Sequence, residues 1–192
     1  MAIEPAVAKV KTLAALEAER AELEQEAYDE KNKLLNQSQF QELLDLQTDE
    51  EPDFVEEIVE MYITDAKDML KELDGIFSET TPAVAPDSEE PSDDKTPAPA
   101  PKPDYNLARA VLHKLKGSSS TFGADGVQQK CEELREHCIN EVFDKCREGE
   151  GSLAQLQENV DNLSEFLAKY TAKTKEIHEM KTGDAAGKAE DK

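Results

Sequence analysis

The sequence is poor in basic residues, and it has no long apolar runs. It holds 22 lysines and arginines against 44 acidic residues, a formal net charge of -22. We therefore expect neither nucleic acid nor an anionic membrane to bind it, because both require a positive patch. No apolar run approaches the roughly 20 residues that span a bilayer, and the N-terminus lacks the apolar core of a signal peptide. The sequence predicts a soluble intracellular protein.

Cysteines are also scarce. The three present, Cys131, Cys138 and Cys146, fit a reducing compartment better than a secreted disulfide framework. No pair has zinc-finger spacing, so we propose no metal site. Val127, Cys131, Leu134 and Cys138 share one helical stripe, which predicts that the first two cysteines are small buried side chains.

Strand patterns are missing as well, because no segment alternates apolar and polar residues between hairpin turns. The sequence therefore predicts an all-α protein. Four long apolar stripes suffice for an antiparallel four-helix bundle, with Asp125 and Ser152 as two of the N-caps. Residues 141–151 are ambiguous between a helix and a turn. The four bundle helices are expected to begin near Pro52, Tyr105, Asp125 and Ser152.

The predicted organisation has three parts. Residues 1–35 read as one long helix from Glu4, which either lies against its own domain or pairs with a partner strand. Residues 36–173 form the bundle domain, which opens with a short helix capped by Ser38, and the proline-rich acidic segment 78–104 interrupts it as a disordered linker. Beyond Lys173 the periodicity fades, so residues 174–192 are expected to be a flexible tail.

The stretch from Tyr105 to Phe122 organises the chain, and its helical period separates two faces. One stripe is mostly apolar and must face a core; it consists of Ala108, Val111, Leu112, Leu115, Ser119 and Phe122. A second stripe lies roughly 140° away by the same geometry and should face solvent. Its members are His113, Lys116, Gly117 and Ser120.

Gly117 is an unusual residue for a helix interior, where glycine costs about 0.5 to 1 kcal/mol relative to alanine. Clearing space above the neighbouring imidazole of His113 would compensate for that cost. Alternatively, Gly117 ends a short helix as a C-cap and His113 is an ordinary solvated residue. The spacing by itself leaves both interpretations open.

The charges near His113 indicate what chemistry it could perform. Residues 105–120 contain Arg109, Lys114 and Lys116 and no acid, although the chain is strongly acidic. This setting suits a group that carries negative charge transiently. A neutral imidazole, with an unperturbed pKa of about 6.5, is a good nucleophile near pH 7. Lys116 would then screen an attached phosphoryl group, and Gly117 would leave room for its oxygens.

Two other chemistries fit the sequence poorly. The serines at 118–120 could supply a nucleophile for a hydrolase, yet no Gly-x-Ser-x-Gly motif surrounds them and no nearby carboxylate would orient His113. Lys116-Gly-Ser reverses the order of a Walker motif, and no glycine-rich loop precedes it.

Several segments of the chain resemble the histidine-containing phosphotransfer proteins of multistep two-component signalling, in their plant and green-algal form. The main block is His113-Lys-Leu-Lys-Gly-Ser-Ser-Ser-Thr-Phe-Gly-Ala124, followed by Cys131-Glu-Glu-Leu-Arg-Glu-His-Cys138. Phe40-Gln-Glu-Leu-Leu-Asp-Leu-Gln47 and Pro52-Asp-Phe-Val55 resemble the segment that precedes the family's phosphohistidine helix. The blocks cover a little over half of the chain in the family's order.

The resemblance implies a carrier whose His113 accepts a phosphoryl group from a receiver aspartate of a hybrid kinase and passes it to a response regulator. It implies that Lys116 screens the phosphate, that Gly117 provides space, and that Ser120, Arg135 and Lys114 have supporting places. Lys114 stands where many relatives have glutamine.

The same resemblance implies no cofactor on this chain, since the receiver brings Mg²⁺. We expect a monomer located in the cytoplasm and nucleus. It needs partner receiver domains for phosphotransfer and is not an enzyme by itself. The competing hypothesis is a helical scaffold that binds receivers without phosphate turnover.

Overall fold

The computed structural model describes residues 12–29, 33–48, 51, 53–78 and 102–187. The predictions for the start of the first helix, for Pro52, for nearly all of the linker and for the last five residues lie outside this part of the chain. Seven helices and no strand form within the described residues. They are α1 (Leu13–Tyr28), α2 (Gln37–Leu44), α3 (Phe54–Ser78), α4 (Tyr105–Phe122), α5 (Asp125–Ile139), α6 (Phe143–Arg147) and α7 (Leu153–Gly187).

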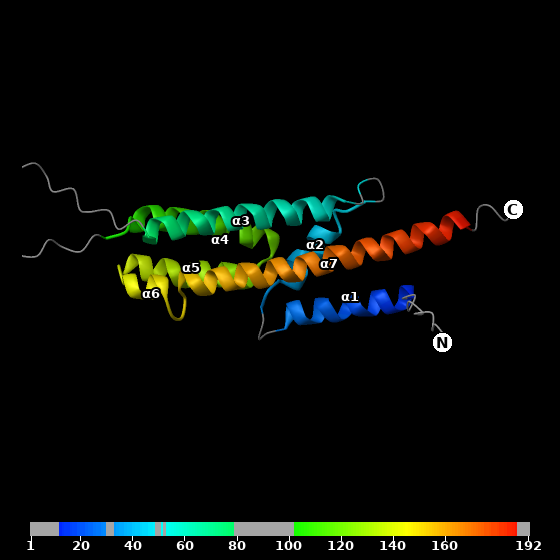
Figure 1. The fold of residues 1–192 in the computed structure, drawn as a ribbon, viewed down its shortest axis with the longest axis horizontal. Coiled ribbons are helices and arrows are strands. Elements are labelled where there is room, and N and C mark those ends of the chain that lie inside the picture. Colours follow the sequence, from blue (N-terminus) through cyan, green and yellow to red (C-terminus); the bar gives the residue numbers. More distant parts are fainter. Residues whose placement is uncertain (1–11, 30–32, 49–50, 52, 79–101, 188–192) are drawn as a thin grey trace, which may run out of the picture.

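Helices α3, α4, α5 and α7 form a four-helix bundle. Each packs on the next, α3 on α4, α4 on α5, α5 on α7 and α7 on α3. Figure 1 shows α3 and α4 together on one side of the bundle, with α5 and the first part of α7 on the other. The apolar stripes meet in one core, which includes Leu73, Leu112, Leu134 and Leu163. The predicted all-α four-helix bundle is confirmed.

The two N-terminal helices pack on the side of this bundle. Helix α7 continues past the other bundle helices, and α1 lies along this extension (Figure 1). Two ion pairs join them, Lys173 to Glu19 at 2.8 Å and Lys181 to Glu17 at 2.9 Å. Helix α2 packs against α4. Of the two arrangements that the sequence left open for the first helix, the chain packs α1 against its own domain.

The C-terminal part of the chain differs from the prediction. A tail was expected beyond Lys173, but α7 remains helical to Gly187. Ile177 is 4% exposed, two turns after the buried Tyr170. The apolar stripe is sparse here because one helix, α1, covers this part of α7, so few positions per turn need to be apolar.

Two predicted caps are wrong, because Asn36 caps α2 and also binds the carboxylate of Asp125 at the start of α5. Helix α2 begins after Asn36, whose Oδ1 accepts a hydrogen bond from the Gln39 amide at 3.2 Å, so Ser38 is not its cap. At the start of α5 no side chain caps the helix, and the Asp125 carboxylate instead accepts a hydrogen bond from Asn36 Nδ2 at 3.3 Å. This contact ties the α1–α2 connection to the turn between α4 and α5.

The ambiguous segment 141–151 forms the short helix α6 and a turn. Ser152 then caps α7 as predicted, its Oγ accepting from the Gln155 amide at 3.4 Å. All three cysteines are buried, and Cys138 Sγ lies 3.9 Å from Cys146 Sγ. The predicted burial of Cys131 and Cys138 is confirmed, and burial raises the pKa of Cys131 to about 12.

Candidate functional site

Helix α4 has the bounds that its sequence predicts, and both ends are capped. The Asp104 carboxylate accepts hydrogen bonds from the amides of Asn106 and Leu107, each at 3.0 Å. At the other end Gly123 adopts a left-handed φ of 84°, and its amide donates to the Ser119 carbonyl. A Cβ at this glycine would lie 2.9 Å from the Gln39 Cβ. Gly123 is therefore the C-cap, and the interpretation in which Gly117 ends the helix is wrong.

The apolar face of α4 fixes the helix against α3. All six residues of the predicted apolar stripe are buried. The Ser119 hydroxyl, although polar, is hydrogen bonded to the Tyr62 hydroxyl at 2.9 Å, and the Phe122 ring stacks on the Tyr62 ring with centroids 4.3 Å apart. These contacts fix the rotation of α4 about its own axis and its position along the bundle axis. The opposite face is thereby presented outward.

On that opposite face His113, Lys114 and Gly117 are exposed, as the wheel geometry predicts for His113 and Gly117. Lys116 and Ser120 are only half-exposed. Lys116 differs from the prediction of a fully exposed stripe because its side chain lies against α5. The histidine therefore sits on a convex helix surface that a partner can reach.

Among the residues that the structure describes, no packing contact requires a glycine at position 117. A Cβ placed there would meet no atom within 4 Å, and the backbone is ordinary helix. An alanine would fit and would favour the helix. The glycine therefore leaves open space on the helix surface one turn after His113.

Glu132 on α5 completes the charge arrangement next to His113. Lys116 Nζ donates to Glu132 Oε2 at 2.7 Å, and Arg135 Nη1 donates to Glu132 Oε1 at 3.2 Å. The Lys116 hydrogen bond is the largest of the effects that lower the pKa of this carboxyl. Because α4 and α5 run antiparallel through a tight turn, the Lys116–Glu132 pair places Arg135 level with His113. Arg135 joins the predicted site through Glu132.

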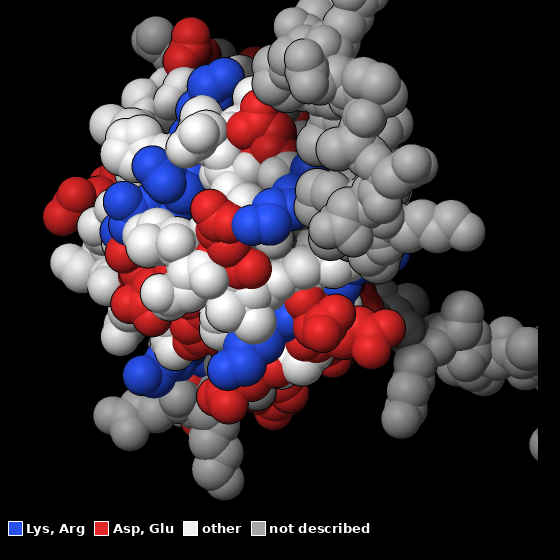
Figure 2. Space-filling view, turned by 90° about the vertical axis from the view of Figure 1, so that its left-hand side faces the viewer, with Lys and Arg blue, Asp and Glu red and all other residues white. Residues whose placement is uncertain are grey.

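Glu132 is the residue that the sequence reasoning missed. Residues 105–120 contain no acid, but α5 brings a carboxylate to the middle of this basic segment. The positive charge near His113 is therefore partly neutralised. Figure 2, which looks onto the α6 end of the bundle, likewise shows basic and acidic side chains interspersed. Away from α4's outward face, Lys102 pairs with Glu141 at 2.8 Å.

The serines beside His113 are engaged in structural contacts. Ser118 Oγ donates to the Leu115 carbonyl at 3.0 Å, and Ser119 is buried against Tyr62. Among the described residues no carboxylate contacts the imidazole of His113, so the orienting acid of a hydrolase triad is missing there. The described residues also contain no group of three or more His, Cys, Asp or Glu side chains that could hold a metal ion.

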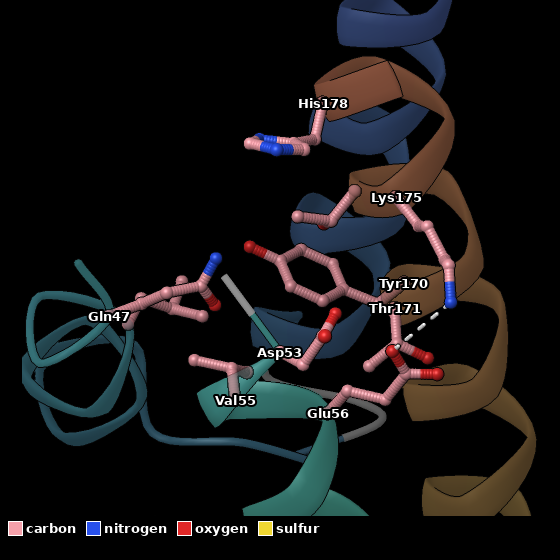
Figure 3. A pocket seen from close by; sticks show the side chains of 10 residues that line it. Gln47, Asp53, Val55, Glu56, Tyr170, Thr171, Lys175 and His178 are labelled. Atoms are coloured by element: carbon pink, nitrogen blue, oxygen red, sulfur yellow. Dashed lines mark ion pairs between the residues drawn. The ribbon is translucent and has the colours of Figure 1, made fainter. Parts of the chain in front are cut away.

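A pocket lies elsewhere on the molecule, between the start of α3, the end of α2 and α7 (Figure 3). Its volume is about 50 Å³, and Lys175 and Glu56, two of its lining residues, form an ion pair of 3.8 Å. None of the predicted site residues lines it. None of the described helices is long and apolar enough to cross a membrane.

The fold and this site together define a helical bundle that presents one histidine on an outward face. The chain belongs to the Hpt domain family, whose model matches residues 57–171. It is 29% identical to histidine-containing phosphotransfer protein 4 of Arabidopsis thaliana over 52% of this chain and 62% of that protein. It is 30% identical to histidine-containing phosphotransfer protein 1 of Oryza sativa subsp. japonica over 56% of this chain and 59% of that protein.

The solved structures lead to the same family. A histidine-containing phosphotransfer protein of Medicago truncatula superposes with a TM-score of 0.64 at 26% identity, covering 88% of this chain and 94% of that one. The chain spans less than two thirds of the length of the two relatives named above. Family membership and the helical bundle are thus shown, and they agree with the resemblance found in the sequence.

Proposed function

We propose that this protein relays a phosphoryl group between receiver domains, with His113 as the phosphoacceptor. The observation that carries the proposal is the outward face of α4, where an exposed imidazole, a lysine one turn away and an open glycine position lie together. Membership of the Hpt domain family supports the same role. Lys116 screens the phosphoryl charge, Gly117 leaves space for its oxygens, and Lys114, Ser120 and Arg135 border the contact surface.

In the transfer, one bond to phosphorus forms at His113 while another breaks at the receiver aspartate. The unprotonated ring nitrogen of His113 attacks the phosphorus of an aspartyl phosphate on the donor receiver. The new N–P bond forms while the P–O bond to the aspartate breaks, and the carboxylate leaves with the electron pair. The other ring nitrogen keeps its proton. The reverse reaction with a second receiver aspartate regenerates the neutral imidazole.

Positioning and charge stabilisation supply most of the catalysis in such a transfer, so the carrier needs its partners. We propose the receivers of a hybrid histidine kinase and of a response regulator as these partners, with Mg²⁺ and the acidic pocket on the receiver side. The convex surface around His113 suits a transient interface in which α2, α3 and α4 of this protein contact the receiver domain. We also propose a monomer without a cofactor of its own, located in the cytoplasm and nucleus.

The test is transfer of labelled phosphate from a phosphorylated receiver. We expect acid-labile label on the wild-type chain and none on His113→Gln. Because the His113 side chain is exposed, the substitution should leave the protein folded, so a missing label would not be due to unfolding. His178→Gln is the matched control, because His178 is also an exposed helix residue and should leave labelling unchanged. Undiminished labelling of His113→Gln would sink the proposal. Receiver binding without any label would favour the scaffold instead.

A further inference from the structure

Glu132, which α5 brings next to Lys116, affects how that lysine can act in the relay. Glu132 uses both carboxylate oxygens, one on Lys116 Nζ at 2.7 Å and one on Arg135 Nη1 at 3.2 Å. Lys116, the lysine expected to screen the phosphoryl group, is therefore already paired with Glu132 in this structure. Its three donors and its flexible stem allow the ammonium to turn to a new acceptor without any change in the helix.

A phosphoryl group on His113 would compete for this ammonium. The group carries roughly two negative charges near pH 7 and presents three strong acceptor oxygens, whereas Glu132 offers one charge. Lys116 and Glu132 keep 35% and 41% of their side-chain surface exposed, and pairs in such surroundings are weak. Arg135, with 38% exposed, can keep hold of the carboxylate when the lysine leaves.

We propose that Glu132 is an exchangeable counter-ion that sets how strongly this protein retains a phosphoryl group. In the unphosphorylated protein Glu132 pairs with Lys116. On phosphorylation Lys116 moves to the phosphoryl oxygens and Arg135 retains Glu132. Glu132 is a positioning residue that acts through Lys116, and it limits the stability of the phosphohistidine so that the group can be passed on. The inference rests on the proposed role of His113.

The two neighbours of Lys116 should have opposite effects. Glu132→Gln frees the lysine, so the phosphohistidine should become more stable. Arg135→Gln leaves Glu132 to Lys116 alone, so the phosphohistidine should become less stable. A purely structural tie between α4 and α5 predicts no such opposition, because both substitutions would weaken the same helix contact.

The experiment measures the equilibrium of phosphoryl exchange between these variants and a receiver that phosphorylates the wild-type chain. We expect Glu132→Gln to shift the equilibrium toward the phosphorylated carrier, and Arg135→Gln to shift it away, each by up to about fivefold, the range of a partly exposed ion pair. In a Lys116→Gln background the Glu132→Gln shift should vanish. Glu165→Gln, which removes a pair of 2.7 Å with Lys169 on α7, is the matched control and should change nothing.

An unchanged equilibrium in Glu132→Gln, shifts of the same sign in both variants, or a shift that persists without Lys116 would overturn the inference. These outcomes are distinct from failure of the proposed function, in which the wild-type chain accepts no phosphate on His113 at all. That result would remove both proposals. Urea unfolding of each variant, run in parallel, separates a change in the exchange equilibrium from a loss of folded protein.

Discussion

The bundle and the extension formed by α1 with the C-terminal part of α7 are held together by different forces. The bundle has a continuous apolar core with a group of packed rings, in which Phe122 lies against Tyr62 and Phe40, and Phe40 against Tyr170. In the extension Leu16 and Ile177 are buried outside that core, Ala27 near the end of α1 belongs to it, and two ion pairs add further links. The bundle therefore fixes His113, and the extension should be the less stable region.

Removing a ring from the bundle should have the largest effect. Phe122 is 5% exposed and stacks on Tyr62, so Phe122→Ala should lower the free energy of unfolding by about 3 to 5 kcal/mol, measured in urea. The loss should be global, because α4 and α3 share this contact.

The matched change in the extension is Ile177→Ala, which also removes a buried apolar side chain. We expect faster amide hydrogen exchange in α1 and in the end of α7, with exchange in α4 and phosphate labelling unchanged. Faster exchange in α4 to the degree seen for Phe122→Ala would show instead that both regions unfold as one unit.

The hydrogen bond between Tyr62 and Ser119 gives the next largest effect within the bundle. Tyr62→Phe leaves the fully buried Ser119 hydroxyl without its partner, which should cost about 1 to 3 kcal/mol of unfolding free energy. Adding Ser119→Ala should recover part of that loss, because this contact then contains no unpaired hydroxyl. Losses that simply add in the double variant would contradict this account.

Alkaline pH tests the same contact. Burial is the main cause that raises the pKa of Tyr62, while the hydrogen bond with Ser119 lowers it in part. The raised pKa means that the folded state favours the protonated phenol. Its contribution to stability is complete well below pH 10, the ordinary pKa of tyrosine in the unfolded chain, and is lost as the pH rises through that value toward the raised pKa of the folded state. Tyr62→Phe should reduce this dependence, as followed by urea unfolding at several alkaline pH values.

Gly117→Ala should separate stability from transfer. Since a Cβ at this position meets nothing, the variant should gain about 0.5 to 1 kcal/mol in unfolding free energy. Phosphate labelling should nevertheless fall severalfold, because the methyl group takes the space beside His113. Gly75→Ala in α3, where a Cβ also meets nothing, should be more stable without any loss of labelling. Equal labelling of both variants would remove the proposed role of Gly117.

The smallest effect is expected in the extension. A double-mutant cycle on Lys181 and Glu17, with alanine at each position, should give a coupling of at most about 1 kcal/mol, because both side chains are about half-exposed. The coupling should shrink as salt is added. A larger coupling that salt does not affect would mean that charge holds the extension as firmly as apolar contacts hold the bundle.

Much of the bundle could be predicted because its signals are local. The bounds of α4 follow from a regular apolar stripe, and the outward face of His113 follows from the same wheel. The end of α7 could not be predicted in this way, because a stripe covered by a single helix is too sparse to recognise. The predicted caps at Ser38 and Asp125 are wrong because Asn36 caps α2 two residues before Ser38, and because Asn36 also binds Asp125, 89 positions away in the sequence.

The sequence by itself determined the all-helical class, the helix that carries His113, and the placing of Lys116 and Gly117 beside it, because helical period relates residues three and four positions apart. Only the tertiary structure decided which carboxylate faces that lysine. The pairing of Lys116 with Glu132 depends on how α4 and α5 are aligned across the turn at Gly123, and this alignment is set by packing of side chains from several helices.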